Sequence, residues 1–134
     1  MLRELGLKVT PQRKEIVKYI FANNHCSAPE IKEHTDKVIS SVSYSTIYLT
    51  AGKLAEAGII IPVSFEPGVV RYDTNTEPHL HVVCYECGHV TEVPFNIGDH
   101  NFEELLSENG FNDIAGFDIH FFAKCKECSR SVKK

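Results

Sequence analysis

The fold of this sequence is decided by residues 59–72, which read IIIPVSFEPGVVRY. Two apolar, β-branched runs flank Glu66-Pro67-Gly68, and this order is typical of a strand, a tight turn and a second strand. Three helical segments precede this hairpin. Helices followed by a hairpin predict a winged helix-turn-helix, in which the third helix enters the major groove of DNA and the hairpin lies against the backbone. The alternative is a three-helix core with no role in DNA binding.

Each of the three helical segments has its own start signal. Thr10-Pro11 places a hydroxyl at the N-cap and a proline at the first helical position, and apolar residues then recur at helical spacing up to about Asn24. Ser27 and Glu30 form a capping box that opens a short helix. The third helix follows the serine-rich stretch 40–45, and we expect it to stop near Gly58.

The third helix is expected to bury Ile47, Ala51 and Leu54 and to turn a polar and aromatic face outward. That face is a candidate DNA contact surface made of Tyr44, Thr46, Tyr48, Leu49, Thr50 and Lys53. Its hydroxyls can contact phosphates and its apolar atoms can meet thymine methyl groups. It lacks an arginine, asparagine or glutamine for bidentate base contacts, so DNA shape should contribute more than usual. Alternatively, the two tyrosines are only half-buried surface aromatics.

The second half of the chain reads as a small α/β domain. The polar segment 74–78 is the expected linker, after which come strands at 79–85, 91–93 and 117–123 and a helix at 101–108. The predicted fold class is therefore α+β. Residues 1–73 form the winged-helix domain, 74–78 the hinge and 79–134 the second domain.

Four of the five cysteines form two C-x-x-C pairs, Cys84 with Cys87 and Cys125 with Cys128. Each pair can supply two ligands to one tetrahedral ion, and four thiolates make a closed structural zinc site. Such a site would join the end of the second domain to its central strand. A redox-active dithiol pair and two disulfides are the competing interpretations. Cys26 is expected to be a small buried apolar residue.

A second group of donors lies around the linker. His79 and His81 alternate by two residues, so both imidazoles face the same side of one strand. Asp73 precedes them and Glu92 follows on the next strand. Imidazoles and carboxylates together suit Fe(II), Mn(II) or Zn(II). An ion bound from both sides of the linker would fix the relative orientation of the two domains, whereas an isolated H-x-H is as often a plain surface pair.

Composition is that of a globular protein. The chain has 134 residues, of which 43% are hydrophobic, and its net charge is −4. This charge argues against a uniformly basic nucleic-acid-binding domain, but residues 1–24 carry a net charge of +3, and phosphate contacts are local. No apolar run approaches the roughly 18 residues of a membrane span, and residues 1–13 lack a secretory signal. A cytoplasmic location is expected.

An enzymatic function is not expected. The sequence shows no nucleophile–base pair, glycine-rich phosphate loop or deaminase motif. We therefore assign no catalytic residue and no small-molecule substrate.

Four short motifs and the two C-x-x-C pairs occur in an order that resembles the ferric uptake regulator (Fur) superfamily. The motifs are Thr10-Pro11-Gln12-Arg13, Ser45-Thr46-Ile47-Tyr48, Arg71-Tyr72-Asp73 and His79-Leu80-His81. The resemblance covers nearly the whole chain. It implies a homodimeric, metal-dependent repressor that binds palindromic DNA operators, with a C-terminal dimerisation domain. The four cysteines match the structural zinc ligands of that superfamily.

The resemblance also implies a regulatory metal site and two DNA contacts. The regulatory ligands are His25, Asp73, His79, His81 and Glu92, and His25 is supplied by the resemblance alone. Arg13 and Tyr48 match the arginine of the TPQR motif and the tyrosine of the recognition helix. Departures are Leu49 and Ala51 in that helix, and Pro78 and Leu80, which stand where some members carry ligands of an additional site. Phe117 replaces a histidine common in the last strand, and His34, His89, His100 and His120 are expected not to be ligands.

The branch of the superfamily is ambiguous. Asp73 resembles the peroxide-responsive branch, in which Fe(II) and hydrogen peroxide lead to oxidation of a ligand histidine, whereas Glu92 resembles the iron regulators. The favoured hypothesis is a repressor of peroxide-stress or iron-homeostasis genes, with a slight preference for peroxide sensing. The alternative is a redox-switched zinc protein, a chaperone or thiol switch, without a specific operator.

Overall fold

The computed structural model describes residues 1–131. The chain forms two compact units that divide after Thr76, inside the polar segment 74–78. We call residues 1–76 the N-terminal unit and the residues from Glu77 onward the C-terminal unit. None of the helices in the described part of the chain has the length and apolar character needed to cross a lipid bilayer.

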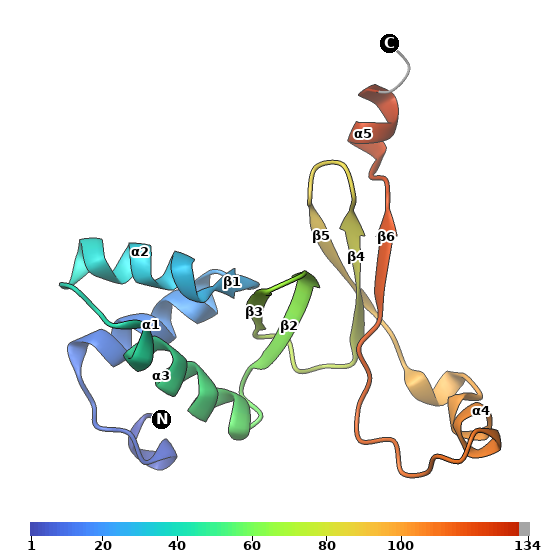
Figure 1. The fold of residues 1–134 in the computed structure, drawn as a ribbon, viewed down its shortest axis with the longest axis horizontal. Coiled ribbons are helices and arrows are strands. Elements are labelled where there is room, and N and C mark those ends of the chain that lie inside the picture. Colours follow the sequence, from blue (N-terminus) through green and yellow to red (C-terminus); the bar gives the residue numbers. More distant parts are fainter. Residues whose placement is uncertain (132–134) are drawn as a thin grey trace. The chain divides into compact units, whose positions relative to one another are not determined.

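The N-terminal unit is a winged helix-turn-helix, as the sequence predicts (Figure 1). Its elements are a short 3-10 turn at Arg3–Leu5, α1 (Pro11–Ala22), β1 (Cys26–Ser27), α2 (Ala28–Val38), α3 (Tyr44–Glu56), β2 (Ile61–Glu66) and β3 (Val69–Asp73). The hairpin of β2 and β3 forms the wing, and β1 adds a third strand in the order β1-β3-β2. The two residues of β1 are too few to give a periodic signal, so the sequence did not predict this strand.

Local capping explains where the helices begin. The hydroxyl of Thr10 accepts a hydrogen bond from the backbone N–H of Arg13 at 3.1 Å. The carboxylate of Glu30 accepts from the backbone N–H of Ser27 at 3.2 Å, and Ser43 caps α3 by accepting from the N–H of Thr46 at 3.2 Å. Each cap satisfies a donor that the first helical turn leaves unpaired. The chain leaves α3 through Gly58, whose φ of +74° suits glycine.

The three helices enclose one apolar core. Ile16, Ile20, Ile31, Ile47 and Leu54 are completely buried. Burying one such side chain contributes about 1.5–3 kcal/mol. The core therefore holds α3 firmly, with its opposite face directed to solvent.

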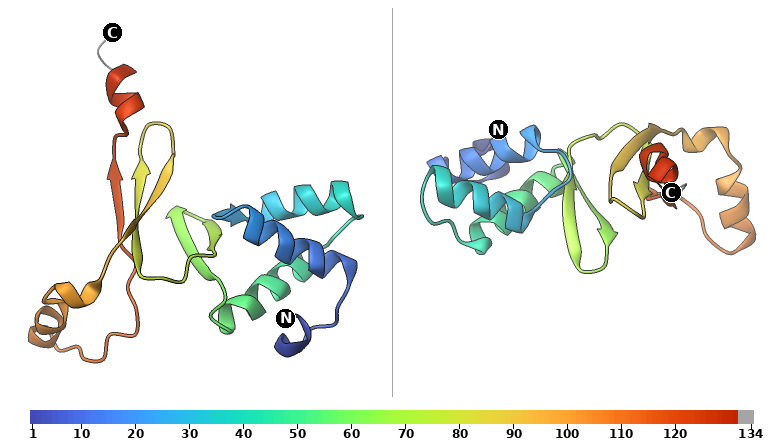
Figure 2. Two further views of the ribbon diagram at one scale, coloured as in Figure 1. Left: turned by 180° about the vertical axis from the view of Figure 1, so that it is seen from behind. Right: turned by 90° about the horizontal axis from the view of Figure 1, so that it is seen from above.

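The C-terminal unit is built on a three-stranded sheet in the order β5-β4-β6. Its elements are β4 (His79–Cys84), β5 (Val90–Pro94), a 3-10 turn at Ile97–Asp99, α4 (Phe102–Glu108), β6 (His120–Ala123) and α5 (Lys126–Ser131). β4 is antiparallel to β5 and parallel to β6, and β4 and β6 lie side by side in Figures 1 and 2. Within this unit, α4 and α5 lie at opposite ends of the sheet (Figure 1).

Two details of this unit differ from the sequence prediction. The last strand begins at His120 and not at Phe117, although the backbone N–H of His81 still donates to the carbonyl of Ile119 at 3.0 Å. The six-residue α5 was not predicted. It is too short for helical periodicity to mark it.

Candidate metal centres and nucleic-acid interface

The two C-x-x-C pairs meet at one end of the sheet. Cys84 ends β4 and Cys128 lies in α5, and their Sγ atoms are 3.7 Å apart. The Sγ atoms of Cys87 and Cys125 are 3.8 Å apart. In a tetrahedral site with Zn–S bonds of about 2.3 Å, neighbouring sulfurs are about 3.8 Å apart. All five cysteines, which lie within the described residues, are unbridged, so the spacing is that of metal ligands and not of disulfides.

Backbone amides favour negative charge in this cluster. The N–H groups of Cys125 and Cys87 point at the Sγ of Cys84 at 3.4 and 3.5 Å. These hydrogen bonds lower the pKa of Cys84 to about 6. The neighbouring thiol of Cys125 instead raises the pKa of Cys128. One thiolate is thus stabilised by the fold alone, and a divalent cation would stabilise the others, which is the donor chemistry of a structural zinc site.

Cys26 is separate from this cluster. It lies in the core of the N-terminal unit, and burial raises its pKa to about 11. Its thiol therefore stays protonated at neutral pH and acts as a small apolar side chain.

In the N-terminal unit, His25 and Asp73 form a pair. Strand pairing of Cys26 with Tyr72 brings their neighbours together, and the Nε2 of His25 lies 3.7 Å from the Oδ2 of Asp73. His25 has a left-handed backbone, with φ of +68°, and its N–H donates to the carbonyl of Tyr72 at 2.9 Å. The residues are adjacent only because β1 pairs with β3, which explains why spacing alone did not reveal His25.

In the C-terminal unit, His79, His81 and Glu92 share one face of the sheet. His81 is 3% exposed and stands directly opposite Glu92 in the β4–β5 register. The Nε2 atoms of His79 and His81 are 3.2 Å apart, and neighbouring nitrogens in a tetrahedral zinc site are about 3.3 Å apart. The Nδ1 of His79 donates to the carbonyl of Glu77 at 2.6 Å. This bond orients the His79 ring so that its Nε2 points toward His81.

The outward face of α3 is smaller than the sequence predicted. Tyr44 and Tyr48 are exposed and their rings stack at 6.1 Å, while Thr46 and Lys53 are half-buried. The prediction that Thr50 faces outward is wrong. Its side chain is 0% exposed, and its hydroxyl donates to the carbonyl of Thr46 at 2.7 Å. At 3.6 residues per turn, position 50 falls within the stripe buried against the core.

Two cations outside α3 make contacts that the sequence did not predict. The Nη1 of Arg13 donates to the carbonyl of Lys8 at 2.9 Å and so fastens the segment before α1. The ammonium of Lys32, on α2, lies 5.5 Å from the centre of the Tyr44 ring. No pattern within α3 points to Lys32, because it comes from another helix.

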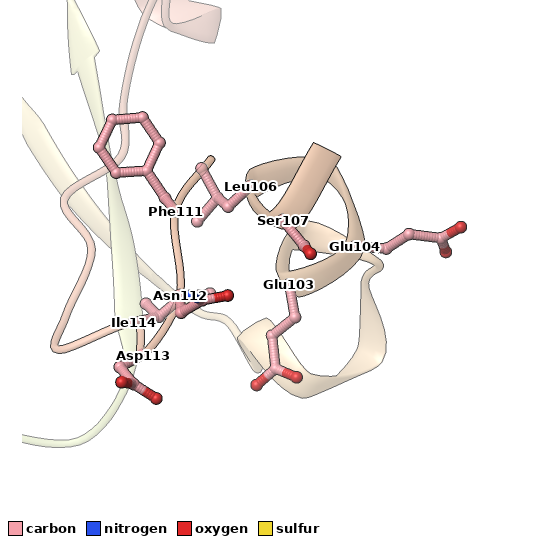
Figure 3. A pocket seen from close by; sticks show the side chains of 8 residues that line it. All are labelled: Glu103, Glu104, Leu106, Ser107, Phe111, Asn112, Asp113 and Ile114. Carbon is pink, nitrogen blue, oxygen red and sulfur yellow. The ribbon is translucent and has the colours of Figure 1, made fainter. Parts of the chain in front are cut away.

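A hollow beside α4 has a different character (Figure 3). Glu103, Ser107 and Asp113 are among its lining residues, with Leu106 and Phe111 at one side. None of the site residues described above lines it. The candidate functional groups therefore lie on the sheet, near β1 and β3, and on α3.

A winged helix-turn-helix followed by a sheet unit with a four-cysteine centre defines a class of metal-binding proteins with a DNA-binding fold. The model of the ferric uptake regulator family matches residues 4–122. The chain therefore belongs to the ferric uptake regulator family, whose members are metal-responsive transcriptional regulators.

Individual relatives span both branches of the family. A peroxide-responsive repressor, PerR, of Staphylococcus aureus is 30% identical over 129 residues, covering 95% of this chain and 86% of the relative. The peroxide stress regulator of Campylobacter jejuni is 28% identical, with a TM-score of 0.68 and 96% of each chain covered. The ferric uptake regulator of Helicobacter pylori, described as having three functional metal-binding sites, is 25% identical, with a TM-score of 0.73 over 96% of this chain and 86% of that one.

Proposed function

We propose that this protein is a metal-dependent repressor that binds a palindromic operator as a homodimer when Fe(II) or Mn(II) occupies a regulatory site. The ligands are His25, Asp73, His79, His81 and Glu92. The observation that best supports this proposal is that each unit already brings some of these ligands close together. His25 and Asp73 are already paired in the N-terminal unit, and His79, His81 and Glu92 share one sheet face in the C-terminal unit.

The donor chemistry supports a regulatory role distinct from the four-cysteine centre. Three imidazoles and two carboxylates suit a borderline or hard ion such as Fe(II) or Mn(II), with Zn(II) as a competitor. The four thiolates suit a permanently bound zinc. The two sites can therefore hold different metals in the same chain, one for folding and one for sensing.

An ion that takes ligands from both units acts as a switch. It restrains the hinge at 74–78 and so restricts the positions of the two recognition helices of a dimer. Half-sites one DNA turn apart require a spacing of about 34 Å. Shifting the population of the DNA-competent state from 1:99 to 99:1 requires about 5.5 kcal/mol of differential metal binding.

The remaining surfaces support the partners. The exposed tyrosines of α3 offer hydroxyl and aromatic contacts to DNA. The C-terminal unit exposes Phe111, Phe121 and Phe122. Exposed apolar side chains of this size favour burial against a second copy of the chain.

Peroxide sensing is the preferred form of this function. The similarity to peroxide-responsive regulators of Staphylococcus aureus and Campylobacter jejuni supports it, as does the aspartate at position 73. With Fe(II) bound, hydrogen peroxide would transfer one oxygen atom to the imidazole of His25 or His79, with water as the other product. The oxidised histidine no longer binds the metal well, so the operator is released.

The test compares operator binding of the Mn(II)-loaded and Fe(II)-loaded protein before and after peroxide. Mass spectrometry of the peptides containing His25 and His79 follows each sample. We expect loss of binding together with the gain of one oxygen atom only in the Fe(II) form. Equal resistance of both metal forms would contradict peroxide sensing and leave iron regulation.

The thiol-switch alternative has one observation in its favour, the low pKa of Cys84 beside the exposed Cys87. It predicts that peroxide ejects zinc and forms disulfides whichever metal is bound at the histidines. Zinc release from the Mn(II) form, measured with a chromogenic chelator, would support this alternative.

A further inference from the structure

A third group of metal donors lies entirely within the C-terminal unit. In the parallel pairing of β4 and β6, His81 stands beside His120. Their rings meet edge to face, with centroids 5.2 Å apart. The Nε2 of His120 lies 2.7 Å from the Oδ1 of Asp118. One donor atom from each of His81, Asp118 and His120 lies within 4.8 Å of the others.

The sheet register explains this grouping. Neighbours in register lie on the same face of a sheet, and residues two apart along an extended chain share a face. Glu92, His81 and His120 therefore form one row across β5, β4 and β6, with Asp118 on the same side. His81 stands at the centre of the row, between the donor on β5 and the donors on and just before β6.

Burial prepares these side chains for a cation. His81 is 3% exposed and the His120 side chain is 13% exposed, whereas the Asp118 side chain is 58% exposed. The sheet holds the two buried rings on one face, where one imidazole nitrogen of each can serve as a metal ligand. The Asp118 carboxylate is exposed, so an ion can reach the three side chains from solvent.

We propose that His81, Asp118 and His120 form a second histidine-based metal site that takes Zn(II) or a similar borderline cation without any ligand from the N-terminal unit. Two imidazoles and one carboxylate match a three-ligand zinc site with an open fourth position. His79 is a further donor close to this group, since its Nε2 lies 3.2 Å from that of His81. Of its three ligands, only His81 also belongs to the proposed regulatory site. The other two, Asp118 and His120, lie just before and at the start of β6.

This site is distinct from the additional site that other family members carry beside the H-x-H histidines. Positions 78 and 80, which hold Pro78 and Leu80, alternate with His79 and His81 and so face the other side of β4. The inference rests on the C-terminal unit alone. It therefore stands or falls independently of operator binding.

The test uses the full chain with zinc bound at the four cysteines. The chain also carries the substitutions His25→Ala and Asp73→Asn, which serve as the background for further variants. That background removes the donors of the N-terminal unit. Co(II), a spectroscopic substitute for Zn(II), is titrated while visible absorption is recorded, and Zn(II) is then added in competition. We expect one further Co(II) per chain, with the intense bands of a four-coordinate ion that Zn(II) displaces.

Adding His120→Ala or Asp118→Asn to this background should weaken Co(II) binding about 10- to 100-fold, in line with losing a group that holds or orients a metal ligand. His120→Gln serves as a second, milder variant, and His100→Ala is the matched histidine control in the same unit. Zinc content and circular dichroism verify that each variant is folded. Unchanged Co(II) affinity in the folded Asp118 and His120 variants, or no Co(II) uptake in the background, would overturn the proposal.

Operator binding with Mn(II) is measured on the unaltered chain and on the His120→Ala chain that retains His25 and Asp73. If the unaltered chain with Mn(II) binds no operator while Co(II) binding in the titration depends on His120 and Asp118, the proposed function fails and the metal site stands. If the operator is bound normally while the titration shows no dependence on His120, the metal site fails and the proposed function stands.

Discussion

The two units of this protein are stabilised in different ways. The N-terminal unit closes its own core, with Ile16, Ile31 and Leu54 fully buried. In the C-terminal unit, Phe111, Phe121 and Phe122 are 65, 56 and 58% exposed. Apolar burial within the chain stabilises the first unit, whereas we propose that the second depends on zinc at its four cysteines and on burial of the exposed rings against a partner. The comparison indicates that the winged-helix unit and the metal-binding unit have separate sources of stability.

Removing one zinc ligand should give the largest effect, because zinc binding in small structural sites contributes about 10–16 kcal/mol, comparable to the stability of a whole domain. We expect Cys125→Ser to abolish zinc binding and disorder the C-terminal sheet while the three N-terminal helices persist. Zinc analysis and amide hydrogen exchange measure both effects. Cys26→Ala is the control and should retain zinc. A zinc-free Cys125→Ser chain with a protected β4 would refute this dependence.

Truncating a core side chain of the N-terminal unit should destabilise that unit and leave the C-terminal unit intact. Ile47 is 0% exposed, so Ile47→Ala should destabilise the N-terminal unit by about 2–5 kcal/mol. Zinc content should stay unchanged. Leu49 lies on the opposite face of the same helix and is 46% exposed. Leu49→Ala should therefore change the stability by no more than about 0.5 kcal/mol. Equal costs for the two variants in denaturant unfolding would mean that α3 packs differently.

Replacing His81 should weaken the stimulation of operator binding by metal while the protein stays folded. His81→Ala removes the central donor of the sheet row, so metal-stimulated operator binding should fall by about 10- to 100-fold. Fluorescence anisotropy with an operator duplex and Mn(II) measures this change. Zinc should remain near one per chain, and His100→Ala should behave as the unaltered protein. Full Mn(II) stimulation in His81→Ala would exclude this residue from the switch.

The smallest effect distinguishes two hydroxyl-bearing residues of α3, Tyr48 and Thr50. Tyr48 is exposed, so Tyr48→Ala should weaken operator binding about tenfold, equal to about 1.4 kcal/mol, with little change in stability. Thr50 is buried, so Thr50→Val should leave operator affinity unchanged while the lost hydrogen bond costs about 0.5–1.5 kcal/mol of stability. The reverse ranking in DNA titrations would restore Thr50 to the contact surface.

Features encoded by neighbouring residues were predictable from the sequence. The caps at Thr10 and Ser27, the hairpin around Pro67-Gly68 and the C-x-x-C pairs each depend on a few adjacent positions. Local capping, turn chemistry and ligand spacing are sufficient to define them.

Features that depend on pairing between distant segments were not predictable. The proximity of His25 to Asp73 needs the two-residue β1 to pair with β3. The position of His120 beside His81 needs the β4–β6 register, which joins segments about 40 residues apart. Thr50 was misplaced because a single polar residue at the edge of a helical stripe gives no signal for burial.

The central claim is that one regulatory ion takes ligands from both units while zinc occupies the cysteines. Anomalous diffraction from crystals of the Mn(II)-loaded protein, recorded at the zinc and manganese edges, tests it most directly. We predict a zinc peak among Cys84, Cys87, Cys125 and Cys128 and a manganese peak in contact with Asp73 and His81 together. A manganese peak bound by residues of one unit only would contradict the account.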